Sequence, residues 1–134
     1  MEIAKGQCNC GEVTFEINEK ISDIYVCHCS ECRKYTGNNG VAVVIVKNEV
    51  FRWTQGEKNI STWNKPTGEW QSQFCRNCGS SLPVMNDKSS MAVPAGSITT
   101  GDQALKVAHH IWVGSKATWD EICNGKQHYA SFNE

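Results

Sequence analysis

The stretch YVCHCSECRKYTG, residues 25–37, places Cys27, Cys29 and Cys32 within six positions. In an extended segment the side chains of Cys27 and Cys29 fall on one face, and His28 falls on the other. A turn after Cys29 can bring Cys32 round to join them. We therefore expect three thiolates from one short connection, all available to a single metal ion.

Two further cysteine pairs each stand directly before a glycine, in CNCG (8–11) and CRNCG (75–79). A glycine there lets the chain turn at positive φ, so that backbone N–H groups can point at sulfur. If the fold brings the two pairs together, they supply the four thiolates of a closed structural zinc site. The expected ligands are Cys8, Cys10, Cys75 and Cys78.

The three cysteines of residues 27–32 favour a catalytic role over a structural one, because they are one ligand short of a closed site. A structural zinc normally takes four protein ligands, whereas a catalytic zinc keeps one position open. Three alternatives remain open at this point. Cys29 and Cys32 could join the CRNCG pair as an ordinary zinc ribbon. The cysteines could form disulfides, or His28 could complete the triplet into a closed site.

The composition is that of a globular protein, with 134 residues, 40% hydrophobic and 20% charged. We expect a single domain over residues 1–134. The formal net charge of −1 gives no basic excess for nucleic acid or an anionic membrane. The start MEIAKGQC has no apolar signal segment, and the longest apolar run, 41–46, is too short to span a bilayer. We therefore expect a cytoplasmic protein in a reducing compartment, where clustered cysteines favour metal over disulfides.

Short β-branched or alternating stretches separated by turn residues predict a mainly β fold. The segment EVTFEI (12–17) alternates apolar and polar residues, and GVAVVIV (40–46) is typical of a buried central strand. EVFRW (49–53) follows a Lys-Asn turn, which predicts a hairpin with the preceding strand. Further expected strands are 23–29, 60–63, 69–74, 81–85, 91–96 and 109–113.

Helix signals are few. Ser30 is the expected N-cap of a short turn that runs to Tyr35. A second helix is expected near TWDEI, where Thr118 and Glu121 form a capping box and Gly125 follows as a stop.

The remaining candidate residues are interpreted conservatively. Cys123 is typical of a small buried hydrophobe. The histidines outside the triplet lack ligand spacing and are interpreted as sheet or surface residues; they are His109, His110 and His128. The tryptophans are interpreted as packing residues, one of which could wall a pocket; they are Trp53, Trp63, Trp70, Trp112 and Trp119. Arg33 and Lys34 follow the triplet and could hold a substrate carboxylate, or be solvated surface cations.

Four segments, GQCNCGEVTF, CHCSECRKYTG, FCRNCGSSL and HIWVGSKATWDEI, resemble in this order the glutathione-dependent formaldehyde-activating enzyme family. This family is also written as GFA or centromere-protein-V-like, and it has an Mss4-like fold. The resemblance covers about residues 5 to 123. It implies compact, stacked antiparallel sheets with zinc knuckles and one or two short helices.

The resemblance also implies roles for the cysteines. It assigns a structural zinc to Cys8, Cys10, Cys75 and Cys78, and a second, catalytic zinc to Cys27, Cys29 and Cys32. The implied activity is that of a carbon–sulfur lyase that joins a small-molecule thiol, glutathione, to formaldehyde as S-hydroxymethylglutathione. From the residues alone, a non-catalytic zinc-binding module that recognises another protein is the alternative. A zinc-ribbon nucleic-acid binder is disfavoured by the balance of 13 basic and 14 acidic residues.

Overall fold

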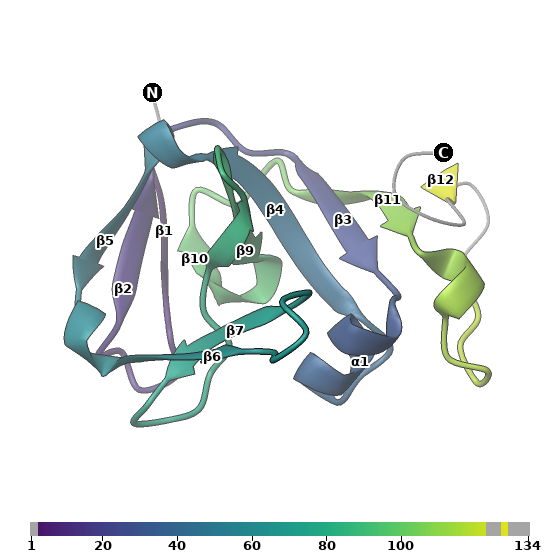
Figure 1. The fold of residues 1–134 in the computed structure, drawn as a ribbon. Coiled ribbons are helices and arrows are strands. Elements are labelled where there is room, and N and C mark those ends of the chain that lie inside the picture. Colours follow the sequence, from purple (N-terminus) through teal and green to yellow (C-terminus); the bar gives the residue numbers. More distant parts are fainter. Residues whose placement is uncertain (1–2, 123–126, 129–134) are drawn as a thin grey trace.

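The computed structural model describes residues 3–122 and 127–128, which form three β-sheets and one α-helix (Figure 1). The first sheet has the strand order β10 (Ile98–Thr100), β1 (Ala4–Gln7), β2 (Thr14–Ile17), β5 (Phe51–Gln55). The second has the order β12 (Gln127–His128), β11 (Lys106–Ile111), β3 (Asp23–Cys27), β4 (Val41–Lys47), β9 (Ser90–Pro94), β8 (Val84–Asp87). The third is the hairpin of β6 (Ile60–Asn64) and β7 (Gln71–Cys75).

Helical segments are short. Helix α1 spans Ser30–Thr36. The 3-10 turns are η1 (Asn48–Val50), η2 (Glu57–Asn59), η3 (Ala95–Ser97) and η4 (Val113–Ser115). The mainly β prediction is therefore confirmed, and most strand pairs are antiparallel. The pairs of β11 with β3 and with β12 are parallel. In the described residues, no helix has the length and apolar character needed to cross a membrane.

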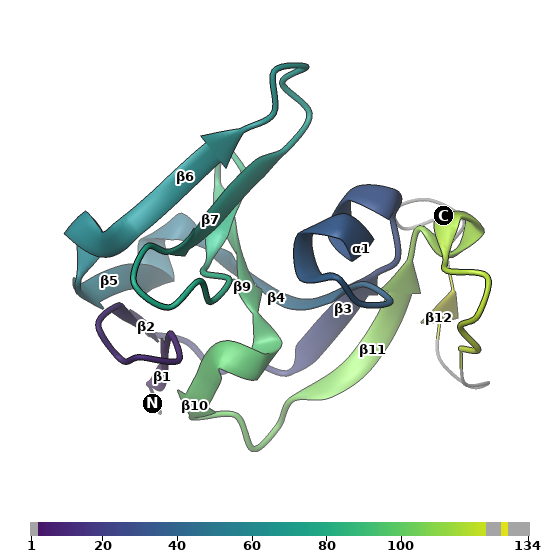
Figure 2. The same ribbon diagram turned by 90° about the horizontal axis from the view of Figure 1, so that it is seen from below.

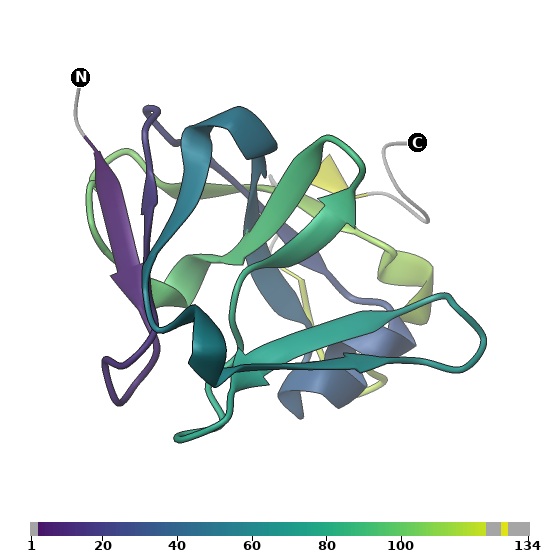
Figure 3. The same ribbon diagram turned by 60° about the vertical axis from the view of Figure 1, so that its left-hand side comes forward.

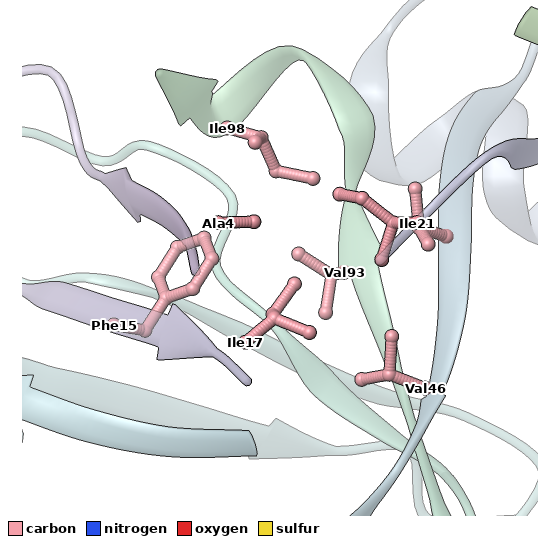
Figure 4. Packing of buried hydrophobic residues seen from close by; sticks show 8 residues of the cluster. Ala4, Phe15, Ile17, Ile21, Val46, Val93 and Ile98 are labelled. Carbon is pink, nitrogen blue, oxygen red and sulfur yellow. The ribbon is translucent and has the colours of Figure 1, made fainter. Parts of the chain in front are cut away.

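The main core lies between the four-stranded and six-stranded sheets (Figure 4). The alternation predicted for β2 is confirmed, because Phe15 and Ile17 point into this core and are fully buried. Phe51 and Trp53 of β5 surround the Phe15 ring, with centroids 5.7 and 6.2 Å away. The other buried members are Ala4, Ile21, Val44, Val46, Val93 and Ile98. Aromatic contacts of this kind stabilise beyond the apolar area they bury.

The predicted hairpin between β4 and β5 is wrong. Turn η1 redirects the chain into the other sheet, where β5 pairs with β2, while β4 pairs with β3 and β9 (Figure 1). The packing of Phe51 and Trp53 on Phe15 explains this choice, because pairing with β4 would take both rings out of the core.

Three strands, β1, β10 and β12, are not predicted from the sequence. Strand β1 buries Ala4 and Gly6, which are too small to produce an apolar pattern. A Cβ built at Gly6 would overlap the Phe15 ring and lie 2.6 Å from the Ser97 carbonyl oxygen. A glycine inside a strand often marks such a close approach.

The second predicted helix is also wrong. Residues 118–122 hold a single turn, in which the Asp120 N–H donates to the Ala117 carbonyl at 3.1 Å. The Asp120 carboxylate instead accepts from Asn39 Nδ2 at 3.3 Å and faces His28, so tertiary contacts outweigh the local capping signal. Cys123 and Gly125 lie outside the described residues.

Candidate functional site

The first cysteine cluster joins the two glycine-terminated pairs. One pair lies in the turn between β1 and β2, and the other begins with the last residue of β7. The glycines after the second cysteines, Gly11 and Gly79, have φ of 81° and 79°, as the sequence predicts. The four sulfur atoms lie within 4.8 Å of one another, which is close enough to share one metal ion; they belong to Cys8, Cys10, Cys75 and Cys78.

Two of the four cysteines of this cluster are packed in a small hydrophobic core. Cys8 and Cys75 are fully buried, and they pack against Val13 and Leu82. The Val13 N–H donates to Cys8 Sγ at 3.4 Å, an N–H···S contact of the kind expected in a metal knuckle. Hydrogen bonds from Ser80 lower the pKa of Cys78 to about 5, which favours its thiolate form.

The second cluster is the Cys27, Cys29, Cys32 triplet, with sulfur atoms also within 4.8 Å of one another. Cys27 ends β3. Cys29, rather than the predicted Ser30, is the N-cap of α1, and its Sγ accepts from the Cys32 N–H at 3.3 Å. Contacts with the thiols of Cys27 and Cys32 hold the pKa of Cys29 far below its usual value. Thiolates this close together repel one another, and a bound cation would offset that repulsion.

The two clusters are separate groups, so Cys29 and Cys32 do not form a zinc ribbon with the pair after β7. The seven cysteines of the described residues are free thiols, not disulfides. All seven predicted ligand positions are brought together in the two expected groups.

His28 is directed away from the triplet. Its buried ring contacts His110 through Nε2, at 2.9 Å from His110 Nδ1, and its Nδ1 lies 3.5 Å from the Asp120 carboxylate. The alternative in which His28 closes the triplet is therefore wrong for this arrangement. His110 and His109 lie in β11, as sheet residues, and His109 stacks on Tyr25 with centroids 4.7 Å apart.

A cavity of about 270 Å³ opens beside the triplet, and Cys27 and Cys32 line it. Strand β4 forms part of its floor with one set of alternating residues, Val41, Val43 and Ile45. The other set, Val44 and Val46, faces the main core. The continuous apolar run of β4 therefore has one face packed in the core and the other face lining an open cavity.

Tyr35 of helix α1 and residues 69–71 of the β6–β7 hairpin line this cavity. Figure 2 and Figure 3 show the helix and the hairpin from two sides. Tyr35 of α1 donates its hydroxyl to the Gln73 carbonyl at 2.7 Å, and its ring meets Trp70 edge-on at 5.4 Å. Lys65 at the hairpin end forms an ion pair with Glu31 at 2.7 Å. The helix that carries Cys32 is therefore tied to the hairpin.

Basic residues lie outside the cavity lining. Arg33 donates through Nε to the Ser115 carbonyl at 3.2 Å. Lys34 and Lys65 line a neighbouring hollow that shares Tyr35 and Trp70 with the cavity. The structure thus does not bring Arg33 or Lys34 to the cavity, where the sequence had left open a contact with a substrate carboxylate.

The sequence leaves open which tryptophan walls a pocket, and the structure places Trp112 in that role. It lines the cavity with Trp70, and its backbone has φ 57° and ψ 37°. Among the described residues it is the one non-glycine with positive φ, a conformation that bulky side chains adopt rarely and at a cost. Nothing in the sequence signals this conformation, because tryptophan is neither a turn former nor a frequent left-handed residue.

A β protein with two groups of metal-type cysteine ligands is the class that the fold and the site define. The family model described as "Glutathione-dependent formaldehyde-activating enzyme" matches residues 3–115, and the chain belongs to this family. A relative from Halomonas elongata, named "Putative glutathione-dependent formaldehyde-activating enzyme", is 25% identical over 132 residues, which cover 93% of this chain and 84% of that one. A crystal structure of a Rhodobacter sphaeroides protein has the same fold, with a TM-score of 0.60 at 18% identity, and the match covers 93% of this chain and 98% of that one.

Proposed function

We propose that this protein, as a single domain over residues 1–134, is a zinc-dependent carbon–sulfur lyase that acts on a thiol adduct. The supporting observation is that Cys27 and Cys32 border the cavity. Within the described residues, the triplet offers three ligand atoms and no fourth within the same reach. Soft thiolates suit zinc, and three of them leave one position for an exchangeable ligand.

The four-cysteine cluster is assigned the structural role. Four thiolates complete a tetrahedral shell, so a zinc ion there has no position left for a substrate. Its ligands lie at the end of β7 and in the β1–β2 turn, and none of the four is among the residues that line the cavity. Two zinc ions per chain, with different roles, follow from this division.

The reaction joins a thiol to a carbonyl compound or separates them. In the forward direction the sulfur bonds to the carbonyl carbon, the carbon–oxygen π bond breaks, and the thiol proton ends on the oxygen. Zinc bound to the triplet would supply an open coordination position that holds a thiol in its deprotonated form. The apolar floor, with Val41 beside Cys27, excludes water from the reacting atoms.

Glu69 is the residue that we assign to carry the proton. It is the one carboxylate among the cavity-lining residues, all of which lie in the described part of the chain. Tyr35 also lines the cavity, but its hydroxyl proton is committed to the Gln73 carbonyl. The family description makes glutathione the first thiol to test and formaldehyde the first carbonyl compound. Free cysteines of this kind persist in the cytoplasm, where we place the protein.

The proposal is tested by exchange NMR on a mixture of a thiol and formaldehyde. The zinc-loaded protein should speed the interconversion of free thiol and hydroxymethyl adduct. The Cys27→Ser variant should lose this effect, whereas Ser61→Ala, outside the cavity, should keep it. If the loaded protein accelerates exchange for none of a broad set of thiols, the non-catalytic interaction module is the better assignment.

A further inference from the structure

The cavity beside the cysteine triplet carries an inference about the substrate. Resting on the lyase function proposed above, we propose that this chain takes a compact, uncharged thiol adduct with an apolar carbon skeleton, and that it discriminates against glutathione.

The chemistry of the cavity lining favours an apolar substrate. Its residues are mainly aliphatic and aromatic, and no lysine or arginine occurs among them. Glu69 is the one charged side chain in the lining. A cavity of this kind attracts apolar carbon by removing it from water, and it offers an anion no compensating charge.

The register of the strands places apolar side chains in a row beside the triplet. Val41 lies opposite Cys27, and Val43 lies opposite both Tyr25 and Pro94. Ile45 continues the strip opposite Ala92. These side chains form a continuous apolar track that begins at the cysteine triplet and runs along β4 for about 13 Å, at roughly 3.3 Å per residue.

Such a track is unusual on the open face of a sheet, where polar residues normally alternate with apolar ones. A substrate whose sulfur lies at the triplet would extend its carbon skeleton along this track. Trp70 and Trp112 flank it with aromatic surface, and the strained backbone of Trp112 suggests a constraint beyond simple packing.

The cavity is a poor match for glutathione, a tripeptide with a carboxylate at each end. Burying a carboxylate requires a cation or several N–H donors. The nearby cations are committed elsewhere, since Arg33 donates to Ser115 and Lys65 pairs with Glu31. Lys34 lines the neighbouring hollow and not the cavity. Glu69 adds like-charge repulsion against an anion.

Calorimetric titration of the zinc-loaded protein distinguishes the substrates without relying on turnover. The probes are benzyl mercaptan, mercaptoethanol, mercaptopropionate and glutathione. We expect benzyl mercaptan to bind at least about tenfold more tightly than glutathione, because only the former fits the apolar track without burying a charge. Mercaptopropionate should bind more weakly than mercaptoethanol, although both are small.

Two variants with matched controls locate the effect. Met85→Gln, at an exposed position on the cavity rim, should weaken benzyl mercaptan binding several-fold, whereas Ile3→Gln, exposed but outside the cavity, should not. Glu69→Lys should raise the affinity for mercaptopropionate about tenfold. Glu57→Lys makes the same charge change outside the cavity and should leave that affinity unchanged.

The outcomes separate the two proposals. If glutathione binds as tightly as benzyl mercaptan, the substrate inference is wrong while the lyase proposal stands. If none of the four thiols binds although both cysteine clusters hold zinc, the open position itself is absent, and both proposals are overturned.

Discussion

Gly40 packs against the backbone of Cys27, one of the three cysteines of the triplet. A Cβ built at this position would overlap the Cys27 carbonyl oxygen and lie 3.2 Å from its carbon. Both are backbone atoms, which cannot move aside as a flexible side chain can. The position of Cys27 relative to Cys29 and Cys32 therefore depends on the absence of a side chain at Gly40.

Gly40→Ala should loosen metal binding at the triplet and lower the free energy of unfolding by about 1–3 kcal/mol, because the added methyl must displace the β3 backbone. Chelator competition followed by elemental analysis should show zinc lost from this variant at lower chelator concentration than from wild type. Gly96→Ala is the matched control, since a Cβ there meets nothing within 4 Å. Equal zinc retention in both variants would contradict the argument.

At the scale of elements, the contact between α1 and the β6–β7 hairpin sets the shape of the cavity. It consists of one partly buried hydrogen bond, from Tyr35 to the Gln73 carbonyl, one aromatic contact with Trp70, and one partly exposed ion pair, Lys65 with Glu31. These contacts differ in expected strength, because a hydrogen bond away from water is costly to break and a solvated ion pair is not.

Tyr35→Phe keeps the ring contact and removes the hydroxyl donor. It should lower the free energy of unfolding by about 1–2 kcal/mol, because the Gln73 carbonyl loses its side-chain partner. Lys65→Gln should cost much less than Tyr35→Phe, since its ion pair is partly solvated. Urea unfolding of the two variants, each with zinc bound, measures the difference. A larger loss for Lys65→Gln than for Tyr35→Phe would mean that the ion pair dominates the contact.

At the scale of the whole molecule, the four-cysteine cluster closes a long loop. Cys10 and Cys75 are 65 residues apart in the chain. A metal ion that joins them removes much of the conformational freedom of the unfolded state, and its binding energy adds to folding. Because β7 ends at Cys75 and also carries Gln73, the same cluster anchors one wall of the cavity.

Cys75→Ala should therefore give an insoluble protein or a melting temperature lower by ten degrees or more, roughly the effect of losing several kcal/mol. Cys29→Ala should leave a folded domain with a much smaller decrease. Thermal unfolding followed by circular dichroism compares the variants. Equal losses in the two proteins would argue against different roles for the clusters.

The sequence predicts the local features of this molecule well, and it does not predict those that depend on contacts between distant segments. The ligand groups follow from spacing and from glycines with positive φ at Gly11 and Gly79, which are local properties. The apolar alternation of β2 is equally local. The partner of β5 and the conformation of Trp112 depend on contacts between segments distant in the chain, so no local pattern encodes them. The cavity was missed for a related reason, because an apolar cavity floor and a buried strand have the same sequence pattern.

The most direct test of the central claim, that the triplet offers a metal ion one exchangeable position, is the absorption spectrum of the protein with cobalt in both clusters. Adding mercaptoethanol should change the cobalt spectrum of the wild-type protein. Cys27→Ser should keep the bands of the four-cysteine cluster and lose this response. A wild-type spectrum that stays unchanged as mercaptoethanol is added, in a protein that holds two cobalt ions per chain, would contradict the account.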